Sequence, residues 1–172
     1  MDNKAEHEAD RKAWYALHVR TGCEEDVALD VYGLGDTATL LPIEHFMIRT
    51  ASGLRERKKV LMPGYVFVEC VMTPHVWQGL RHTKNVLRIL GDPYEEIPDD
   101  QMTNLIALYW HCINGTKAVR VGGVPQVIEG PLLEVTHEIT CADEREGTLT
   151  VLLDLPGGKR EVTVHAEFIK QG

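Results

Sequence analysis

Apolar and polar residues alternate along several short stretches of this chain, which is the period of a β-strand. The clearest alternation covers residues 62–71, with the sequence MPGYVFVECV. It places Tyr65 and Phe67 on one face of the predicted strand and Val66, Val68 and Cys70 on the other. Other apolar or alternating stretches predict strands at residues 14–20, 40–49, 55–61 and 86–90, with a hairpin loop at 51–54.

Three stretches repeat apolar residues at the spacing of an α-helix. The first follows Thr21-Gly22-Cys23-Glu24, which has the form of a capping box, and extends from about Cys23 to Gly33 or Gly35. A short second helix begins at Thr73-Pro74, since Thr caps helix N-termini and Pro suits the first helical position. A longer third helix opens at Pro98, and its expected apolar stripe comprises Met102, Leu105, Ile106, Tyr109, Cys112 and Ile113.

The segment Asn114-Gly115-Thr116-Lys117 ends the third helix and separates two regions of different pattern. Helices and strands mix before it, whereas strand patterns follow it, with a hairpin around Pro156-Gly157-Gly158. We therefore predict an α+β domain at residues 13–114, a linker at 115–118 and a small all-β domain at 119–172. Residues 1–12 carry seven charges and are expected to be a disordered leader.

Composition narrows the class of protein. The 172 residues include 26 Asp and Glu against 18 Lys and Arg, a formal net charge of −8. Strong binding to nucleic acid without sequence preference is disfavoured, because phosphates repel such a chain. The charged start does not resemble a signal peptide, and no apolar run approaches the roughly 20 residues of a membrane span. We therefore expect a cytoplasmic protein that does not associate with membranes and keeps its four cysteines reduced.

No residue pattern typical of an enzyme or a metal site stands out. The closest pair of potential metal ligands is His111-Cys112, whose side chains point about 100° apart on a helix and do not easily share an ion. Cys70 lies on an apolar strand, and no nucleophile elbow occurs. We expect no catalytic residue, no metal and no cofactor. A small enzyme with Cys70 or Cys112 as nucleophile is the least supported functional hypothesis.

Two features indicate a surface for a partner instead. Tyr65 and Phe67 would form a docking patch if helices cover only the other side of the sheet; the alternative is that both belong to the core. Basic residues gather in the run Arg55-Glu56-Arg57-Lys58-Lys59, on a predicted hairpin. This run is either a charged edge strand that prevents unwanted strand pairing or a contact for nucleic acid.

In their order along the chain, these residues resemble the N-terminal domain of the NusG family of transcription elongation factors. The resemblance rests on Trp14-Tyr15, on Gly22 with Glu24, on the strand from Pro63 to Val68 and on residues 86–91. It covers about Trp14 to Ile113, and a short β region stands where the family has its KOW domain. The resemblance implies an antiparallel N-terminal sheet flanked by helices, followed by a small all-β barrel.

The resemblance also implies a partner, bacterial RNA polymerase, whose clamp helices on the largest subunit would bind an apolar face of the first domain. The residues that carry over to this contact are His18, Met62, Tyr65 and Phe67. A second polymerase contact would fall on Thr73, Pro74 and His75. Such a factor is usually monomeric, and it alters pausing or termination while it travels with the polymerase.

The chain departs from the family pattern, and the basic run at residues 55–59 and the short linker also fit a specialised paralogue of the RfaH or LoaP kind, a processive antiterminator. Gly130-Pro131-Leu132 is not followed by the glycine of a KOW turn, so the β domain is a divergent KOW. In relatives the partner of this domain is Rho or a ribosomal protein, and the sequence does not decide which partner this β domain has. The sequence also leaves open whether this domain can switch from strands to helices. Such paralogues recruit through a DNA or RNA hairpin, for which the candidate contacts are Arg20, Arg55, Arg57, Lys58 and Lys59. The alternative function is an RNA-binding module in ribosome assembly or translation.

Overall fold

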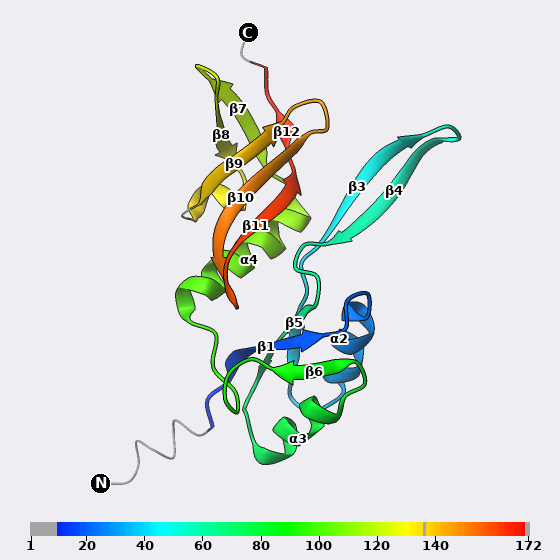
Figure 1. Cartoon of the computed structure of the whole chain (residues 1–172), viewed down its shortest axis with the longest axis vertical. Helices are drawn as coiled ribbons and strands as arrows, with labels where there is room; N and C mark the ends of the chain where they lie inside the picture. The colour runs from blue at the N-terminus through cyan, green and yellow to red at the C-terminus, as the bar shows by residue number, and fades with distance from the viewer. Residues whose placement is uncertain (1–9, 136, 171–172) are drawn as a thin grey trace. The chain divides into compact units, whose positions relative to one another are not determined.

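The computed structural model describes residues 10–135 and 137–170, so the predicted leader falls outside it except for residues 10–12. Figure 1 shows the elements along the chain. The helices are α2 (Glu24–Tyr32), α3 (Pro74–His82) and α4 (Asp99–Asn114), with a 3-10 turn η1 (Pro131–Glu134). The strands are β1 (Ala13–Val19), β2 (Ala38–Leu40), β3 (Ile43–Thr50), β4 (Gly53–Val60), β5 (Tyr65–Cys70), β6 (Val86–Ile89), β7 (Lys117–Val121), β8 (Val124–Glu129), β9 (Glu138–Asp143), β10 (Thr148–Leu155), β11 (Gly158–His165) and β12 (Glu167–Phe168). Within the described ranges, every helix is too short or too polar to cross a membrane.

The described chain divides into two units that are each compact. The first comprises residues 10–41 and 62–98, and the second comprises residues 42–61 and 99–170. Helix α4 and the β3–β4 hairpin thus belong with the C-terminal strands, whereas the sequence places both in the first domain. Strand β7 also begins inside the predicted linker, at Lys117. The independence of residues 13–114 as a domain stays a prediction.

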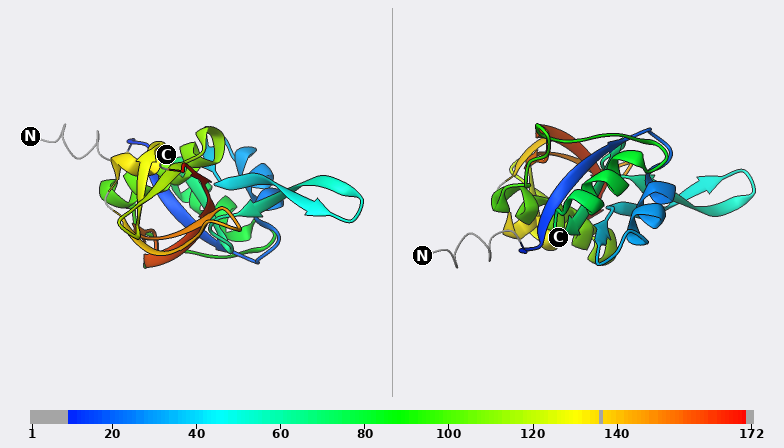
Figure 2. Two further views of the ribbon diagram at one scale, coloured as in Figure 1. Left: turned by 90° about the horizontal axis from the view of Figure 1, so that it is seen from above. Right: turned by 90° about the horizontal axis from the view of Figure 1, so that it is seen from below.

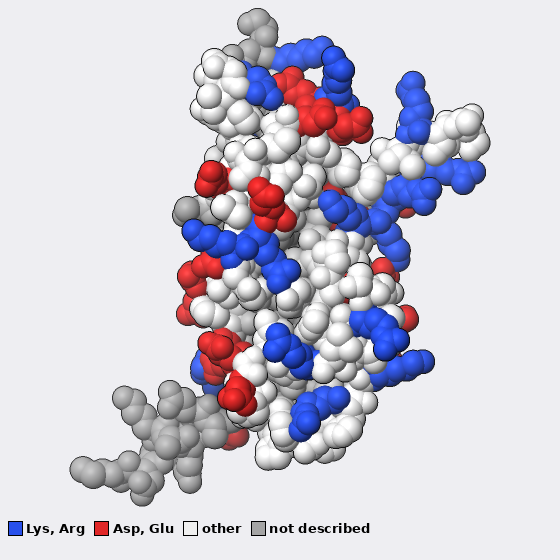
Figure 3. Space-filling model, in the orientation of Figure 1, with Lys and Arg blue, Asp and Glu red and all other residues white. Residues whose placement is uncertain are grey.

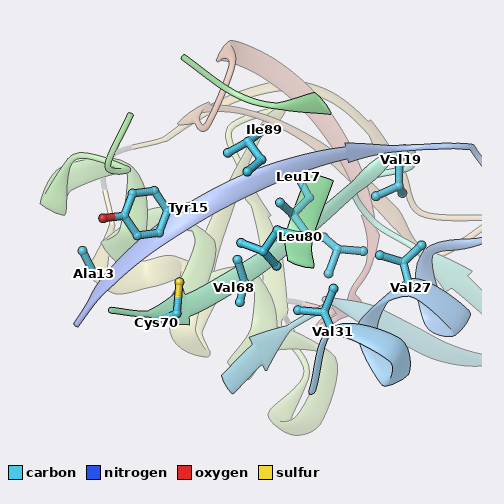
Figure 4. Packing of buried hydrophobic residues seen from close by; sticks show 11 residues of the cluster. Ala13, Tyr15, Leu17, Val19, Val27, Val31, Val68, Cys70, Leu80 and Ile89 are labelled. Carbon is cyan, nitrogen blue, oxygen red and sulfur yellow. The ribbon is translucent and has the colours of Figure 1, made fainter. Parts of the chain in front are cut away.

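The first unit is built on one antiparallel sheet with the strand order β2-β5-β1-β6. Helices α2 and α3 cover one face of it, and their buried Val27, Val31 and Leu80 pack against the central strands (Figure 4). Val66 and Val68 of β5 belong to this core, as the alternation predicts. Burying one such aliphatic side chain stabilises the fold by about 1.5–3 kcal/mol. The opposite face of β5 carries Tyr65 and Phe67.

One buried carboxylate joins the sequence motifs of the first unit. Glu24 is 4% exposed, and its side-chain oxygens accept hydrogen bonds from the backbone N–H of Gly64 at 2.8 Å and of Gly22 at 2.9 Å. Gly64 has a φ of +84°, which favours glycine, and its carbonyl accepts the Val19 N–H at 2.8 Å. The predicted capping box is wrong, because Cys23 is the N-cap of α2 and no side chain caps it. Glu24 instead fixes the start of β5 beside the end of β1.

The β3–β4 hairpin of the second unit is an extended two-stranded ribbon, as both views of Figure 2 show. Its strands pair from Ile43 with Val60 to Thr50 with Gly53. The sequence predicts one strand over residues 40–49, but the structure divides it into β2 and β3 at Leu41-Pro42. Pro42 has no N–H for a sheet hydrogen bond, which explains the break. The hairpin therefore begins one residue after a proline.

The rest of the second unit consists of α4 and two small sheets, with the orders β12-β7-β8 and β11-β10-β9. The predicted hairpin around residues 156–158 is confirmed as β10 and β11. The predicted stripe on α4 is partly wrong: Ile106 and Ile113 are exposed, and the helix buries Met102, Leu105, Ala107, Leu108 and His111. Gly130, in the Gly-Pro pair before η1, has a φ of +112°, and a Cβ there would lie 2.6 Å from the Gly115 carbonyl oxygen. This position therefore requires glycine.

Candidate functional site

Three aromatic rings form a row on the face of the first unit's sheet that lies opposite α2 and α3. Strands β1 and β5 pair His18 with Tyr65, and their rings lie 5.5 Å apart. The ring of Phe67 lies parallel to that of Tyr65 at 6.3 Å, because residues two apart on a strand share a face. We call His18, Tyr65 and Phe67 the aromatic row.

Exposure differs along this row and its neighbour Met62. His18 and Tyr65 are half-buried, whereas Phe67 is 0% exposed and Met62 is 2% exposed. The burial of Phe67 agrees with the alternative that it belongs to the core, and Met62, expected from the resemblance alone, is buried as well. His18 and Tyr65 are the members of the predicted clamp-helix set that a partner can reach directly.

The predicted second polymerase contact lies at the start of α3. Thr73 is the N-cap, and its hydroxyl oxygen accepts the Val76 N–H at 3.2 Å. Pro74 occupies the first helical turn, where its missing N–H costs nothing. Thr73, Pro74 and His75 are all exposed. These three residues thus lie together at the N-terminal end of α3. The start of this helix at Thr73-Pro74 agrees with the sequence prediction.

The basic run lies on β4, and strand geometry divides it between two faces of the hairpin. Arg55, Arg57 and Lys59 share one face, which also carries Phe46 and Ile48 from β3. Lys58 lies on the opposite face, beside Glu56. Figure 3 shows the hairpin, at the right of the view, carrying mainly Lys and Arg among its charged side chains. The five residues of the run therefore do not form one binding face.

Lys59 is the least exposed basic residue of the run. Its ammonium group donates a hydrogen bond to the Thr163 carbonyl oxygen of β11 at 2.8 Å. Arg55, Arg57 and Lys58 are exposed. The predicted role of Lys59 in nucleic-acid contact thus competes with a structural role at the base of the hairpin.

Arg20 follows β1 in the first unit, where its backbone N–H donates to the Asn85 carbonyl oxygen at 2.9 Å. The same unit also holds a groove of about 390 Å³ that was not expected from the sequence and is lined in part by Trp77, Arg81 and Arg88. The Arg81 guanidinium lies 4.5 Å from the centre of the Trp77 ring, and the Trp77 indole N–H is buried without a hydrogen-bond partner among the described residues. Only the spacing of Trp77 and Arg81, four residues apart on a helix, could have indicated this pair.

Cys70 and Cys112, the two candidate nucleophiles, are not placed for nucleophilic chemistry. Burial raises the pKa of the Cys70 thiol to about 11. Burial also raises the pKa of Cys112, and the nearby Glu44 charge adds to this, bringing it to about 12. Both thiols are therefore protonated at neutral pH, when the thiolate is the reactive form. Among residues 10–135 and 137–170, no group of three or more His, Cys, Asp or Glu side chains is placed to hold a metal ion.

Comparison with known proteins identifies the family. A sequence model of the NusG family, described as transcription termination factor nusG, matches residues 12–106, more than half of the chain. The transcription termination/antitermination protein NusG of Staphylococcus carnosus (strain TM300) is 28% identical over 176 aligned positions, which cover 94% of this chain and 95% of that protein. The protein of the same name from Staphylococcus aureus (strain Mu50 / ATCC 700699) is 26% identical, and the alignment again covers 94% of this chain and 95% of that protein.

A solved structure agrees at the level of the fold. The structure titled "Domain interaction in Thermotoga maritima NusG" has a TM-score of 0.63 and 23% sequence identity, and the match covers 91% of this chain and 95% of that one. The α+β class with a small β domain is thereby confirmed. The family model and the Staphylococcus relatives confirm the resemblance deduced from the motifs. The chain belongs to the NusG family of transcription factors.

Proposed function

We propose that this protein is a non-enzymatic transcription elongation factor that binds bacterial RNA polymerase and modulates pausing or termination, acting as a specialised processive antiterminator. Its relatives named for termination and antitermination support the transcription role. The polymerase contact is assigned to the clamp helices of the largest subunit. The first unit supplies the binding face.

The single observation that carries this proposal is the aromatic row. Its rings stand on the sheet face opposite α2 and α3, so they do not contribute to the core that those helices close. Aromatic side chains bury about 150–250 Å² each and commonly act as interface anchors. His18 and Tyr65 offer the first contact, and use of Met62 and Phe67 requires that these buried side chains become accessible.

The test is the binding of the full chain to an isolated clamp-helix fragment of bacterial RNA polymerase. Tyr65→Ala should weaken binding by at least about 2 kcal/mol, roughly 30-fold in Kd, if Tyr65 is an anchor. Tyr32→Ala is the matched control, because Tyr32 is a tyrosine on α2 with 67% exposure. Phe67→Ala is less informative, since emptying a fully buried site costs about 3–5 kcal/mol of stability.

Equal affinity of the wild type, Tyr65→Ala and Tyr32→Ala would contradict the assigned face. Absence of binding by all three, together with binding to ribosomal RNA, would favour the alternative, an RNA-binding module in ribosome assembly or translation. The second polymerase contact is tested separately with His75→Ala. This variant should keep its affinity for the clamp helices and lose part of its effect on pausing during transcription.

The exposed arginines of the hairpin support a contact with a DNA or RNA hairpin. Replacing Arg55 and Arg57 by Ala together should lower the affinity and reduce the salt slope by roughly 2, since each phosphate contact contributes about 0.9. Lys58→Ala tests the opposite face of the ribbon and should have little effect if one face binds. Arg20→Ala examines the candidate in the first unit. An unchanged affinity and salt slope in the Arg55 and Arg57 double variant would refute this contact.

A further inference from the structure

Three segments that are far apart in sequence meet at the carboxylate of Glu44, the second residue of β3. Oε1 of Glu44 lies 2.8 Å from Nε2 of His111 on α4. Oε2 lies 2.9 Å from Nδ1 of His165 at the end of β11, and the His165 backbone N–H donates to Oε1 at 2.6 Å. Glu44 is 4% exposed and His111 is 2% exposed. The carboxylate is thus nearly withdrawn from water and is held by three donors.

The partners of Glu44 are themselves fixed. Because an ionised carboxylate only accepts hydrogen bonds, His111 Nε2 and His165 Nδ1 must carry protons. The other ring nitrogen of His111 lies 2.7 Å from the Thr116 hydroxyl, which sets the orientation of this ring. The His165 ring stacks on Phe46 with centres 4.0 Å apart. Phe46 is on the same face of β3 as Glu44, so the stacking extends the contact along the hairpin.

A second attachment lies directly across the hairpin. Lys59 is the cross-strand partner of Glu44, and its ammonium group donates to the Thr163 carbonyl oxygen. Thr163 and His165 are two residues apart on β11, so both strands of the hairpin base are attached to one strand. Exposed ion pairs contribute little to stability because water screens them. Glu44 is buried, and hydrogen bonds to a charged group are among the stronger ones, so its contacts contribute more.

We propose that Glu44 is a positioning residue that locks the base of the basic hairpin to α4 and β11, so that the hairpin moves as one body with the C-terminal strands. The attachments are on the two strands of the hairpin at its base, whereas Arg55 and Arg57 lie farther toward its turn. Removing the attachments at the base leaves the pairing of β3 with β4 intact and changes only the direction in which the hairpin points. The consequence for ligand recruitment rests on the proposed nucleic-acid contact, but the lock itself does not.

The experiment measures the orientation of the hairpin by NMR in the full chain without nucleic acid. In the wild type, residual dipolar couplings of β3 and β4 should fit the same alignment tensor as those of β10 and β11. In Glu44→Ala they should require a separate tensor, and amide exchange near the hairpin base should rise at least about tenfold, because a charged hydrogen-bond acceptor has been lost. The His165 ring should also lose its Nδ1-protonated signature in ¹⁵N spectra.

Two further variants make the test decisive if Glu44→Ala does not fold. His165→Phe keeps a ring to stack on Phe46 and removes the side-chain donor, and Lys59→Met keeps the apolar stem and removes the ammonium group. His45→Ala is the matched control, because His45 is exposed and faces Glu56 on the other side of β3. A shared alignment tensor in folded Glu44→Ala would overturn the proposal. If that variant does not fold, a shared tensor together with unchanged amide exchange near the hairpin base in both His165→Phe and Lys59→Met would overturn it. Separate alignment with unchanged hairpin-DNA or hairpin-RNA affinity would support the lock and exclude its role in binding.

Discussion

Glu44 should make the second unit sensitive to acid. Burial alone would raise the pKa of this carboxyl, but the hydrogen bonds from His111 and His165 outweigh that effect and lower the pKa from 4.5 to about 2. A group whose pKa is depressed by folding stabilises the folded state when it is ionised. The stabilisation is therefore complete above about pH 4.5 and is lost as the pH falls through about 2.

The size of the effect follows from the shift. A difference of about 2.5 pKa units corresponds to roughly 3 kcal/mol, at about 1.4 kcal/mol per unit. Glu44→Gln removes the charge and also points an amide NH₂ toward one of the N–H donors. At pH 7 the variant should therefore be less stable than the wild type by about 3 kcal/mol, and most of this difference should disappear near pH 2.

The assay is urea unfolding at a series of pH values, followed by hydrogen exchange of amides in α4 and β10, which belong to the second unit. Only the difference between the wild type and Glu44→Gln is interpreted, because other carboxylates also titrate. Glu56→Gln, on the exposed face of the hairpin, controls for the loss of a charge. If the difference in the free energy of unfolding between the wild type and Glu44→Gln stays constant from pH 7 to pH 2, the Glu44 carboxylate is not held by donors in the folded protein.

Three further changes test the structural reading of the motifs. Glu24→Ala leaves the Gly64 N–H buried without an acceptor and should cost about 1–3 kcal/mol in chemical unfolding of the first unit; a loss under 0.5 kcal/mol, roughly the effect of a neutral surface change, would contradict the role of this carboxylate. Thr73→Ala removes the N-cap of α3 and should lower the stability by about 1 kcal/mol, measured by the melting temperature, whereas Thr73→Ser should be near wild type. Gly130→Ala forces a Cβ against the Gly115 carbonyl at positive φ and should destabilise the second unit by more than about 1 kcal/mol; unchanged exchange in β7 would count against this.

The strand β5 could be predicted closely because alternation divides its residues between two faces. Alternation assigns Val66 and Val68 to one face and Tyr65 and Phe67 to the other, and the structure agrees. Alternation does not reveal how exposed a face is, which is why the sequence left open whether Phe67 belongs to a docking patch or to the core. The break at Pro42 could have been read from the sequence, since proline cannot donate to a ladder.

Helix α4 shows where periodicity is insufficient. Apolar residues surround much of this helix, so several stripes fit the pattern, and only packing decides which one is buried. The structure buries the stripe that includes the polar His111 and exposes Ile106. The His111 contact with Glu44 has no local signature, because the two residues are 67 positions apart.

The Glu44 contacts also bear on how the protein is completed during synthesis. Glu44 and His165 are 121 residues apart, and synthesis proceeds at about 5–20 residues per second. His165 is therefore added to the chain roughly 6–24 s after Glu44. The strands of the hairpin can pair at once, since hairpins form in about 1–10 μs. A nascent chain thus carries a formed basic arm that can contact His111 of α4 first, and the attachment is complete only when the last long strand is made.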